Sequence, residues 1–367
     1  MLSDPISSMS THRLADDLEE IFYRAGDFWE AFRDRRVFVT GGTGFFGKWL
    51  LESLVWADHH LSLGLRVVVL TRDPWRLKAE LPHLAASRAI SFITGDVRTF
   101  SFPDEKFAYV FHLATTSAEA TFAGEGPLEK FTTSAYGTQR VLEFAARCGV
   151  EKFLLTSSGN AYGPARAPGA LLAEDDRLAP DIECPESSAL GEGKRASELL
   201  ARIFSGTYGF EVKLCRCFSF IGPYLQTDLH YAAGNFIRDA VCGRPVQVKG
   251  SGRPLRSFLY PTDLIVWLLT LLFRGVSCRL YNVGSDEVVS IRELAEKIAR
   301  ASGGSVVIEG DETRLATSSP DVYVPSISRI TSELGVRREV SIETAIARTL
   351  AFHSKEVDSR IGCLPWN

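Results

Sequence analysis

The clearest chemical signal in the sequence is a glycine series, Gly41-x-x-Gly44-x-x-Gly47, that directly follows the apolar run Val37–Thr40. Glycines at this spacing permit a tight turn, a close approach of the backbone to a diphosphate, and close packing of a helix on a strand. The N–H groups that open the helix favour an anion. Between a strand and a helix, the series predicts a dinucleotide site. The residues expected to line it are Gly41, Thr43, Gly44, Phe45, Phe46 and Gly47.

The end of the second apolar run bears on which dinucleotide is bound. An acidic residue there would bind the ribose 2′-hydroxyl and favour NAD. This sequence instead reads Thr71-Arg72-Asp73. Arg72 could meet a 2′-phosphate, and Asp73 could still reach a hydroxyl, so NAD and NADP both stay open. A solvated Arg-Asp turn without a ligand is the third alternative.

Composition excludes several classes of protein. The 367 residues are 45% hydrophobic and 23% charged, with a net charge of -4, so we expect a folded globular chain and no dedicated nucleic-acid binder. The longest apolar stretch, Leu264–Phe273, has ten residues, fewer than the roughly 20 that span a bilayer. Asp4 argues against a signal peptide. We expect no membrane segment.

Seven cysteines are scattered without a C-x-x-C pair. Buried thiols are favoured over a metal or redox site, so we expect no metal and a reducing, cytoplasmic location.

The glycine series must be positioned by alternating strands and helices. Apolar runs with the character of buried strands alternate with helical patterns, which predicts an α/β fold with a doubly wound parallel sheet covered on both faces. Helical spacing from Leu14 to Phe32 predicts an amphipathic packing helix before the first strand. Expected strands include 66–71, 90–94, 109–112, 152–156 and 212–218, and expected helices include 127–148, 187–204, 234–242, 263–273 and 291–301.

Further motifs, in order, resemble the extended short-chain dehydrogenase/reductases that act on nucleotide sugars, the epimerase/dehydratase family. The resemblance runs from about Arg36 to Val336. Its motifs are Gly41-x-x-Gly44-x-x-Gly47, Gly95-Asp96-Val97, His112-Leu113-Ala114, Thr156-Ser157-Ser158 with Tyr162-Gly163, Arg216-x-Phe218-x-x-x-Gly222-Pro223, Arg256-Ser257-Phe258 through Asp263, and Tyr281-Asn282-Val283-Gly284.

The resemblance implies a Rossmann-type sheet with a smaller C-terminal substrate-binding lobe. On this basis we expect residues 1–35 to be a tail and helix, 36–220 mainly the NAD(P)-binding domain, 221–350 mainly the interleaved lobe, and 351–367 a tail. A homodimer through the helices 127–148 and 187–204 is also implied.

Site residues follow from the same resemblance. Asp96 and Val97 would contact the adenosine part of the dinucleotide, and Leu113 and Ala114 would lie beside it. Ser158 would hold a substrate hydroxyl or carbonyl. Further implied residues are Lys194 on the nicotinamide ribose, Asn160 beside the sugar, and Asn235 and Arg256 on the diphosphate. The alternatives are a strand-end serine, a surface lysine and a structural salt bridge of Arg256.

One catalytic position departs from the family. Its tyrosine, four residues before the lysine, transfers a proton as hydride moves, but Leu190 stands there in this sequence. Leucine carries no proton, so either another group acts or the usual step is not catalysed. Candidate substitutes are Tyr162, Glu186, Glu192 and Cys184.

Other departures narrow the reaction. The family's dehydratases carry an Asp-Glu pair after the catalytic Ser/Thr, and its decarboxylases carry a nearby Glu, whereas Gly159 and Asn160 stand here. This favours 4-epimerisation, then ketoreduction, of a nucleotide-diphosphate sugar. Ser134 replaces a helix asparagine. In the last lobe Tyr323–Ser326 stands where relatives carry Arg or Asp, which leaves the nucleotide base open. The alternative function is a catalytically silent homologue that binds dinucleotide and sugar nucleotide.

Overall fold

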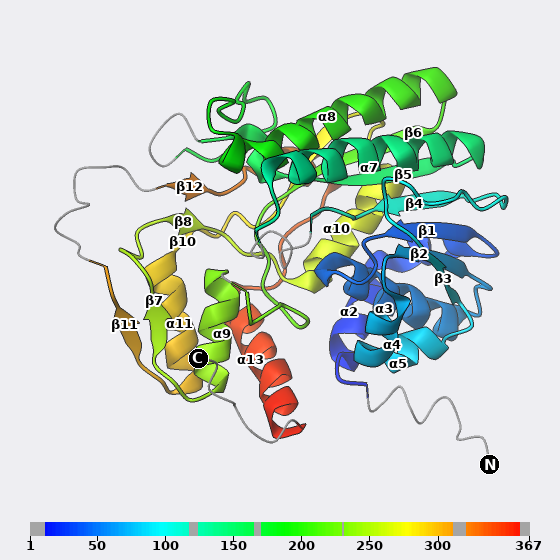
Figure 1. The fold of residues 1–367 in the computed structure, drawn as a ribbon. Coiled ribbons are helices and arrows are strands. Elements are labelled where there is room, and N and C mark those ends of the chain that lie inside the picture. Colours follow the sequence, from blue (N-terminus) through cyan, green and yellow to red (C-terminus); the bar gives the residue numbers. More distant parts are fainter. Residues whose placement is uncertain (1–11, 117–123, 165–169, 230, 311–320, 360–367) are drawn as a thin grey trace, which may run out of the picture.

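A computed structural model describes residues 12–116, 124–164, 170–229, 231–310 and 321–359 (Figure 1). Seven parallel strands form the main sheet in the order β3-β2-β1-β4-β5-β6-β9. The order reverses between β1 and β4, which confirms the doubly wound α/β prediction. The strands are β1 Arg36–Thr40, β2 Arg66–Thr71, β3 Ile90–Thr94, β4 Tyr109–His112, β5 Lys152–Ser158, β6 Glu211–Cys217 and β9 Leu280–Val283.

Helices cover both faces of this sheet (Figure 1). Val37 and Val39 of β1 belong to one apolar cluster with α3 and α10, while Phe38 belongs to another with α7 and α8. Alternate side chains of a strand point to opposite faces, so β1 is buried on both. The helices are α3 Phe45–Leu61, α4 Pro74–Glu80, α5 Pro82–Ala86, α7 Pro127–Arg147, α8 Pro185–Tyr208 and α10 Pro261–Arg274.

The leading helix is shorter than predicted. α2 spans Ala15–Ala25, and the chain continues as a 3₁₀ segment, η1, over Gly26–Phe32. The prediction of one helix from Leu14 to Phe32 is wrong beyond Ala25 because Gly26 takes a φ of +50°, outside the helical region. Its packing role is visible, since Trp29 and Phe32 are buried in the cluster shared with α3 and α10.

The C-terminal part builds a second core. Helices α9, α11 and α13 and strands β7 and β11 surround a cluster that includes Phe236, Ile298 and Ile346. These elements lie beside the seven-stranded sheet in Figure 1. Strand β9 returns to the main sheet, so the two parts interleave. Bounds are α9 Ala232–Val241, β7 Val246–Val248, β8 Leu255–Arg256, β10 Val289–Ser290, α11 Ile291–Ser302, β11 Val306–Ile308, β12 Val322–Tyr323, α12 Ser328–Leu334, α13 Ile342–Ser359 and the 3₁₀ turn η2 Gly159–Tyr162. The domain limits themselves stay a prediction.

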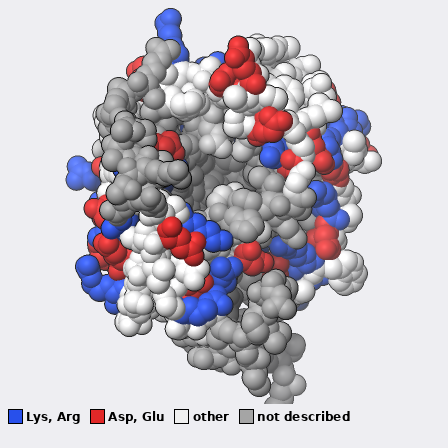
Figure 2. Space-filling model, turned by 60° about the vertical axis from the view of Figure 1, so that its left-hand side comes forward, with Lys and Arg blue, Asp and Glu red and all other residues white. Residues whose placement is uncertain are grey.

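Two further expectations concern the surface and the thiols. Among the described residues, no helix is long and apolar enough to cross a membrane, and Leu264–Phe273 lies within α10. Figure 2 shows basic and acidic side chains interspersed over the face that it draws. The six cysteines of the described segments are free thiols. Cys148, Cys215 and Cys217 are buried as expected, but Cys184 is exposed because it precedes α8 on a loop.

Candidate functional site

The turn between β1 and α3 contains two glycines that are required by the packing of the surrounding backbone. Gly41 has a φ of +72°, and a Cβ there would lie 2.7 Å from the backbone N of Ala114 at the end of β4. A Cβ on Gly47 would lie 2.3 Å from the carbonyl O of Gly41. These two glycines therefore let β4 and α3 close on the turn.

Gly44 differs from these neighbours. Its φ is -83°, and an added Cβ would meet within 4 Å only the Gly41 carbonyl O, at 3.4 Å. Internal packing thus does not demand glycine there. The residue is exposed at the N-cap of α3, where the first helical N–H groups favour an anion. Its small size leaves room for an external group, and the turn fits a pyrophosphate.

The aromatic pair after the turn packs on Phe220, in the segment that follows β6. Phe45 and Phe46 are half-buried, and the Phe46 ring lies 4.7 Å from that of Phe220, edge to face. Thr43 is also half-buried. The predicted glycine-turn residues therefore lie together at the carboxyl end of β1, where ligands of such sheets bind.

The end of β2 leaves Arg72 exposed, while Asp73 is already engaged. The Asp73 carboxylate accepts hydrogen bonds from the backbone N–H of Trp75 at 2.9 Å and Arg76 at 3.3 Å, and so caps α4. Capping explains this aspartate without a ligand. NAD and NADP stay undistinguished by these contacts.

The ends of β3 and β4 lie near the same turn. Asp96 accepts two hydrogen bonds from the Arg98 guanidinium, at 2.8 and 3.0 Å, and these lower the pKa of its carboxyl. Leu113 and Ala114 follow β4, where their N–H groups donate to the backbone O and the Oγ1 of Thr40. Val97 lies against α7, because a Cβ on Gly137 would come within 2.8 Å of it.

A buried polar chain lies behind the turn. His112 is hydrogen-bonded to Thr40 at 2.7 Å and to Thr138 at 3.0 Å, and the Thr138 hydroxyl donates to Ser197 Oγ. This order makes His112 Nε2 the donor to Thr138 and Nδ1 the acceptor from Thr40. Burial lowers the His112 pKa to about 3, so the imidazole is neutral and acts as a structural link between β1, β4 and the helices α7 and α8.

Lys194 is not a surface lysine. Its side chain is buried, and Nζ donates a 2.9 Å hydrogen bond to the backbone O of Thr156 on β5. Burial lowers its pKa to about 8, against the opposing influence of nearby Cys217 and Cys215. A buried ammonium with a single protein acceptor among the described residues retains donors for ribose hydroxyls.

Ser158 ends β5, two residues beyond Thr156. Its Oγ accepts a 3.1 Å hydrogen bond from the backbone N–H of Asn160 and also bonds the hydroxyl of Tyr323. Asn160 is exposed. Gly159 between them is buried, and a Cβ there would lie 2.7 Å from the Tyr323 hydroxyl. Sequence reasoning connected Tyr323 only with nucleotide-base specificity and missed this contact.

The four candidate substitutes for the missing tyrosine have other partners or lie exposed. The Tyr162 hydroxyl is buried and donates to Asn282 Oδ1 at 2.8 Å. Glu192 is paired with Arg195, at 3.4 Å. Glu186 and Cys184 are exposed at the start of α8. Leu190 lies half-buried on the same helix, one turn before Lys194.

Arg256 and Asn235 are the predicted diphosphate contacts. Arg256 Nη2 donates to the Asp321 carboxylate at 2.7 Å, so the salt-bridge alternative is occupied in this structure. Asn235 is half-buried on α9. The neighbouring Tyr231 is exposed, and His230 lies outside the described residues. Ser134, which replaces a family asparagine, is buried with its Oγ unbonded within the described chain.

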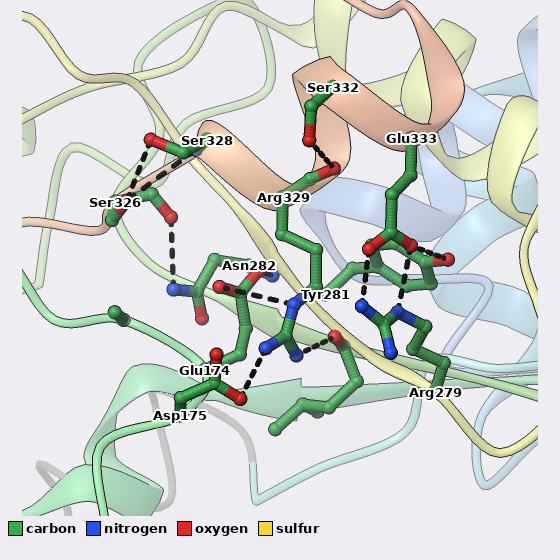
Figure 3. Close-up of polar contacts among 12 residues, drawn as sticks. Glu174, Asp175, Arg279, Tyr281, Asn282, Ser326, Ser328, Arg329, Ser332 and Glu333 are labelled. Carbon is green, nitrogen blue, oxygen red and sulfur yellow. Dashed lines mark hydrogen bonds and ion pairs between the residues drawn. The ribbon is translucent and has the colours of Figure 1, made fainter.

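Asn282 has a structural role that the motif alone left undecided. Its amide nitrogen donates to the backbone O of Leu172 and Ser326, at 2.8 and 3.1 Å, and its Oδ1 accepts from Tyr162. Figure 3 shows the neighbouring Arg329 paired with Asp175, and Arg279 with Glu333. The side chain of Asn282 thus connects the segment that follows β12 with Leu172 and Tyr162.

A group that sequence reasoning missed joins His12, Glu52 and His83, whose ligand atoms lie within 4.8 Å of one another. The His12 and His83 Nε2 atoms are 3.3 Å apart. His12 Nδ1, however, accepts from the N–H of Leu14, which places the proton on Nε2. A metal-binding histidine usually donates through its other nitrogen, so hydrogen bonds to Glu52 explain the group without an ion.

The reversed strand order, the glycine turn and the anion-favouring start of α3 define a fold of Rossmann type, the class of fold in which dinucleotides bind at this turn. Comparison with known families then identifies it further. A model of the NAD dependent epimerase/dehydratase family matches residues 37–284. The chain belongs to this family, which confirms the resemblance found in the sequence.

Curated relatives include UDP-glucuronic acid decarboxylase 1 of Arabidopsis thaliana, 27% identical over 86% of this chain and 69% of the relative. A dTDP-glucose 4,6-dehydratase of Streptomyces niveus is 26% identical over 87% of this chain and 92% of its own.

Solved structures share the fold. A dTDP-glucose 4,6-dehydratase from Streptomyces venezuelae, with NAD and TYD bound, superposes with a TM-score of 0.73 over 88% of this chain and 98% of its own, at 24% identity. UDP-glucuronic acid 4-epimerase from Bacillus cereus, in complex with NAD, gives 0.71 over 88% and 99%, at 20% identity.

Proposed function

We propose that this protein is an NAD(P)-dependent enzyme that interconverts nucleotide-diphosphate sugars through a 4-keto sugar, with epimerisation as the first candidate and ketoreduction as the second. When bound, the dinucleotide would supply the hydride acceptor or donor. One observation carries this proposal: Ser158 and the buried Lys194 both lie at the carboxyl end of β5. Lys194 donates to the backbone O of Thr156, and Ser158 follows Thr156 by two residues on the same strand.

Each predicted residue has a task in this proposal. The glycine turn with Thr43, Phe45 and Phe46 would hold the pyrophosphate, and Lys194 would bond the nicotinamide ribose. Ser158 would hold the reacting sugar oxygen, and Asn160 would lie beside the sugar. The remaining contacts are Arg72, Asp96, Val97, Leu113 and Ala114 on the dinucleotide, and Asn235 and Arg256 on the substrate diphosphate.

Water loss and decarboxylation are disfavoured by the residues after Ser158. Gly159 has no side chain, and Asn160 has an amide, so neither can abstract a proton as a carboxylate does. Decarboxylation and 4,6-dehydration, the activities that the names of the two curated relatives give, would therefore need a base that this stretch lacks.

A catalytically silent binding protein is the second candidate function. Leu190 supports it because the family's proton-transferring phenol is absent from α8. A silent homologue would keep dinucleotide and sugar-nucleotide affinity but transfer no hydride.

Mass spectrometry of small molecules released from the purified protein would identify the dinucleotide and any trapped sugar nucleotide. Chromatography of a panel of UDP- and dTDP-sugars after incubation detects epimerised products, and absorbance at the nicotinamide band detects net oxidation or reduction. Together the two assays separate the two functions. Turnover supports the enzyme, whereas affinity without turnover supports the silent homologue. Gly44→Val should abolish dinucleotide binding, and unchanged binding would contradict the site.

The predicted homodimer gains support from the surface of two helices. α7 and α8 pack on each other and expose large apolar side chains, namely Leu128, Tyr136, Leu199, Ile203 and Tyr208. Contiguous exposed apolar surface is typical of interfaces. Light scattering coupled to size exclusion tests the dimer directly.

A further inference from the structure

The phenol of Tyr323 reaches the serine that ends β5. Tyr323 lies on β12, in the C-terminal part of the chain, and its hydroxyl bonds the side chain of Ser158 and the backbone N–H of Asn160. The protein thus has a tyrosine oxygen beside Ser158 although position 190 offers none. The Tyr323 hydroxyl reaches Ser158 from a different element than a tyrosine at position 190 of α8 would, since β12 belongs to the three-stranded sheet with β8 and β10.

Gly159 and Tyr323 depend on each other. A Cβ on Gly159 would lie 2.7 Å from the Tyr323 hydroxyl oxygen and 2.8 Å from its Cζ, closer than real Cβ atoms come. Any side chain at position 159 would therefore push the phenol away from Ser158. A carboxylate side chain at position 159 is therefore incompatible with the Tyr323 phenol in the position it takes here.

The tyrosine ring is held in place on several sides. Its centroid lies 4.9 Å from that of Phe218. Register pairs Tyr323 with Arg256 of β8, whose guanidinium carbon lies 5.8 Å from the ring centre. The segment beyond β12 is fixed by Asn282, which donates to the Ser326 carbonyl (Figure 3). It is also fixed by the backbone N–H of Leu172, which donates to the Val324 carbonyl. A proton-transferring group needs such fixed geometry.

We propose that Tyr323 Oη exchanges a proton with the oxygen on the reacting sugar carbon, in place of the tyrosine that the family carries at position 190; this inference rests on the proposed function. In the reductive direction the carbonyl oxygen of a 4-keto sugar takes the proton from Tyr323 Oη, while the carbonyl carbon takes hydride from a reduced nicotinamide dinucleotide. The C=O double bond becomes a C–O single bond with new C–H and O–H bonds. Tyrosine is left as phenolate and the dinucleotide is oxidised. Oxidation of the alcohol is the reverse.

The surroundings suit an oxygen that gains and loses a proton. The backbone N–H of Asn160 and the hydroxyl of Ser158 can both donate to a phenolate, and the cationic Arg256 favours it. Burial outweighs these influences and raises the pKa of Tyr323 to about 12. The phenol is therefore protonated at neutral pH and begins as a proton donor, which suits reduction of a keto sugar.

The test compares wild type with Tyr323→Phe, which keeps the ring on Phe218 and removes only the hydroxyl. Dinucleotide and UDP or dTDP affinities are measured by calorimetry. Hydride transfer is followed in single turnovers by nicotinamide absorbance, with NADH or NADPH and 4-keto UDP- and dTDP-sugars. We expect affinities within about twofold and a rate reduced by roughly 10²- to 10⁴-fold, the range of general acid–base catalysis. Tyr23→Phe, on the exposed face of α2, is the matched control.

The double variant Leu190→Tyr with Tyr323→Phe separates chemistry from structure. If the lost phenol is the cause, a tyrosine at the family position should restore at least a tenth of the wild-type rate. A structural role would give no such rescue, and that outcome, or a Tyr323→Phe rate within threefold of wild type, overturns the inference alone. Wild type that binds both ligands without hydride transfer overturns the proposed enzyme function, and the inference with it.

Discussion

The guanidinium of Arg256 and the carboxylate of Asp321 form a 2.7 Å ion pair at the proposed diphosphate position. The side chain of Arg256 is about one quarter exposed and that of Asp321 nearly two thirds, so water weakens the pair. A nucleotide diphosphate would have to compete with Asp321 for the same guanidinium. In the proposed site Asp321 would therefore compete with the substrate for Arg256.

Asp321→Asn should raise the affinity for UDP or dTDP. Removing an exposed carboxylate frees a cation worth up to about 1 kcal/mol, which corresponds to roughly two- to fivefold in the dissociation constant. Calorimetry at low salt measures the change. Asp104→Asn, at an exposed ion pair with Arg147, is the control and should leave affinity unchanged. Equal affinity of Asp321→Asn and wild type would show that Asp321 does not compete with the diphosphate for Arg256.

Lys194→Met should weaken dinucleotide binding by more than tenfold, since Nζ is the proposed ribose donor. Its effect on stability should depend on pH. Burial lowers the Lys194 pKa from 10.5 to about 8, so the folded protein holds this proton less tightly than the unfolded chain. The destabilisation is present below pH 8 and is relieved as pH rises to about 10.5. The stability of wild type relative to Lys194→Met should therefore increase, on the order of 3 kcal/mol, between these values.

Urea titrations of both proteins at pH 7 and pH 10 measure this difference, because the variant cancels the pH dependence of all other groups. A difference that is the same at both pH values would mean that Lys194 has the same pKa in the folded protein as in the unfolded chain, and the lowered pKa of a buried Lys194 ammonium would be contradicted.

Glu52 connects the residues before α2 with α3 and α5. The carboxylate is buried, and burial alone would raise its pKa, but hydrogen bonds from His12 and His83 lower it to about 2. A lowered pKa stabilises the fold above pH 4.5, and this stabilisation is lost as pH falls towards 2. Glu52→Gln should therefore cost about 3 kcal/mol at pH 6 and much less at pH 3. Glu30→Gln, at an exposed pair, is the control and should change little at either pH.

Zinc provides a separate test of the same residues. Because the Leu14 N–H donates to His12 Nδ1, we expect the three side chains to be satisfied by hydrogen bonds. A stoichiometric addition of Zn²⁺ should change the unfolding temperature by less than about 1 °C, whereas a bound ligand at 100 times its dissociation constant adds about 2.7 kcal/mol. A zinc-dependent rise that His83→Ala removes would instead establish a metal site.

The sequence predicted the main sheet well because its strands are local apolar runs and its glycine turn has a fixed geometry. The break at Gly26 was missed because the apolar spacing of Trp29 and Phe32 continues smoothly through it. The Tyr323 contact was missed for another reason. It joins residues 158 and 323 through the pairing of β12 with β8, and no local pattern encodes a contact between such distant segments. The sequence indicated only that Leu190 stands where the family carries a tyrosine, which raised the question of a substitute without locating it.

Gly159→Ala tests the dependence of Gly159 and Tyr323 on each other. The new methyl would also lie 2.8 Å from Phe218 Cε1, so both aromatic side chains must move. We expect a stability loss of roughly 1–3 kcal/mol from overpacking and at least a tenfold loss of hydride transfer. Dinucleotide affinity should be retained, because the glycine turn lies at the end of β1. Gly206→Ala, in an open position of α8, is the control. Since alanine favours a helix by up to about 1 kcal/mol relative to glycine, the Gly206→Ala control should be at least as stable as wild type. A Gly159→Ala enzyme that transfers hydride as fast as this control would show that the position of the Tyr323 phenol does not matter for the reaction.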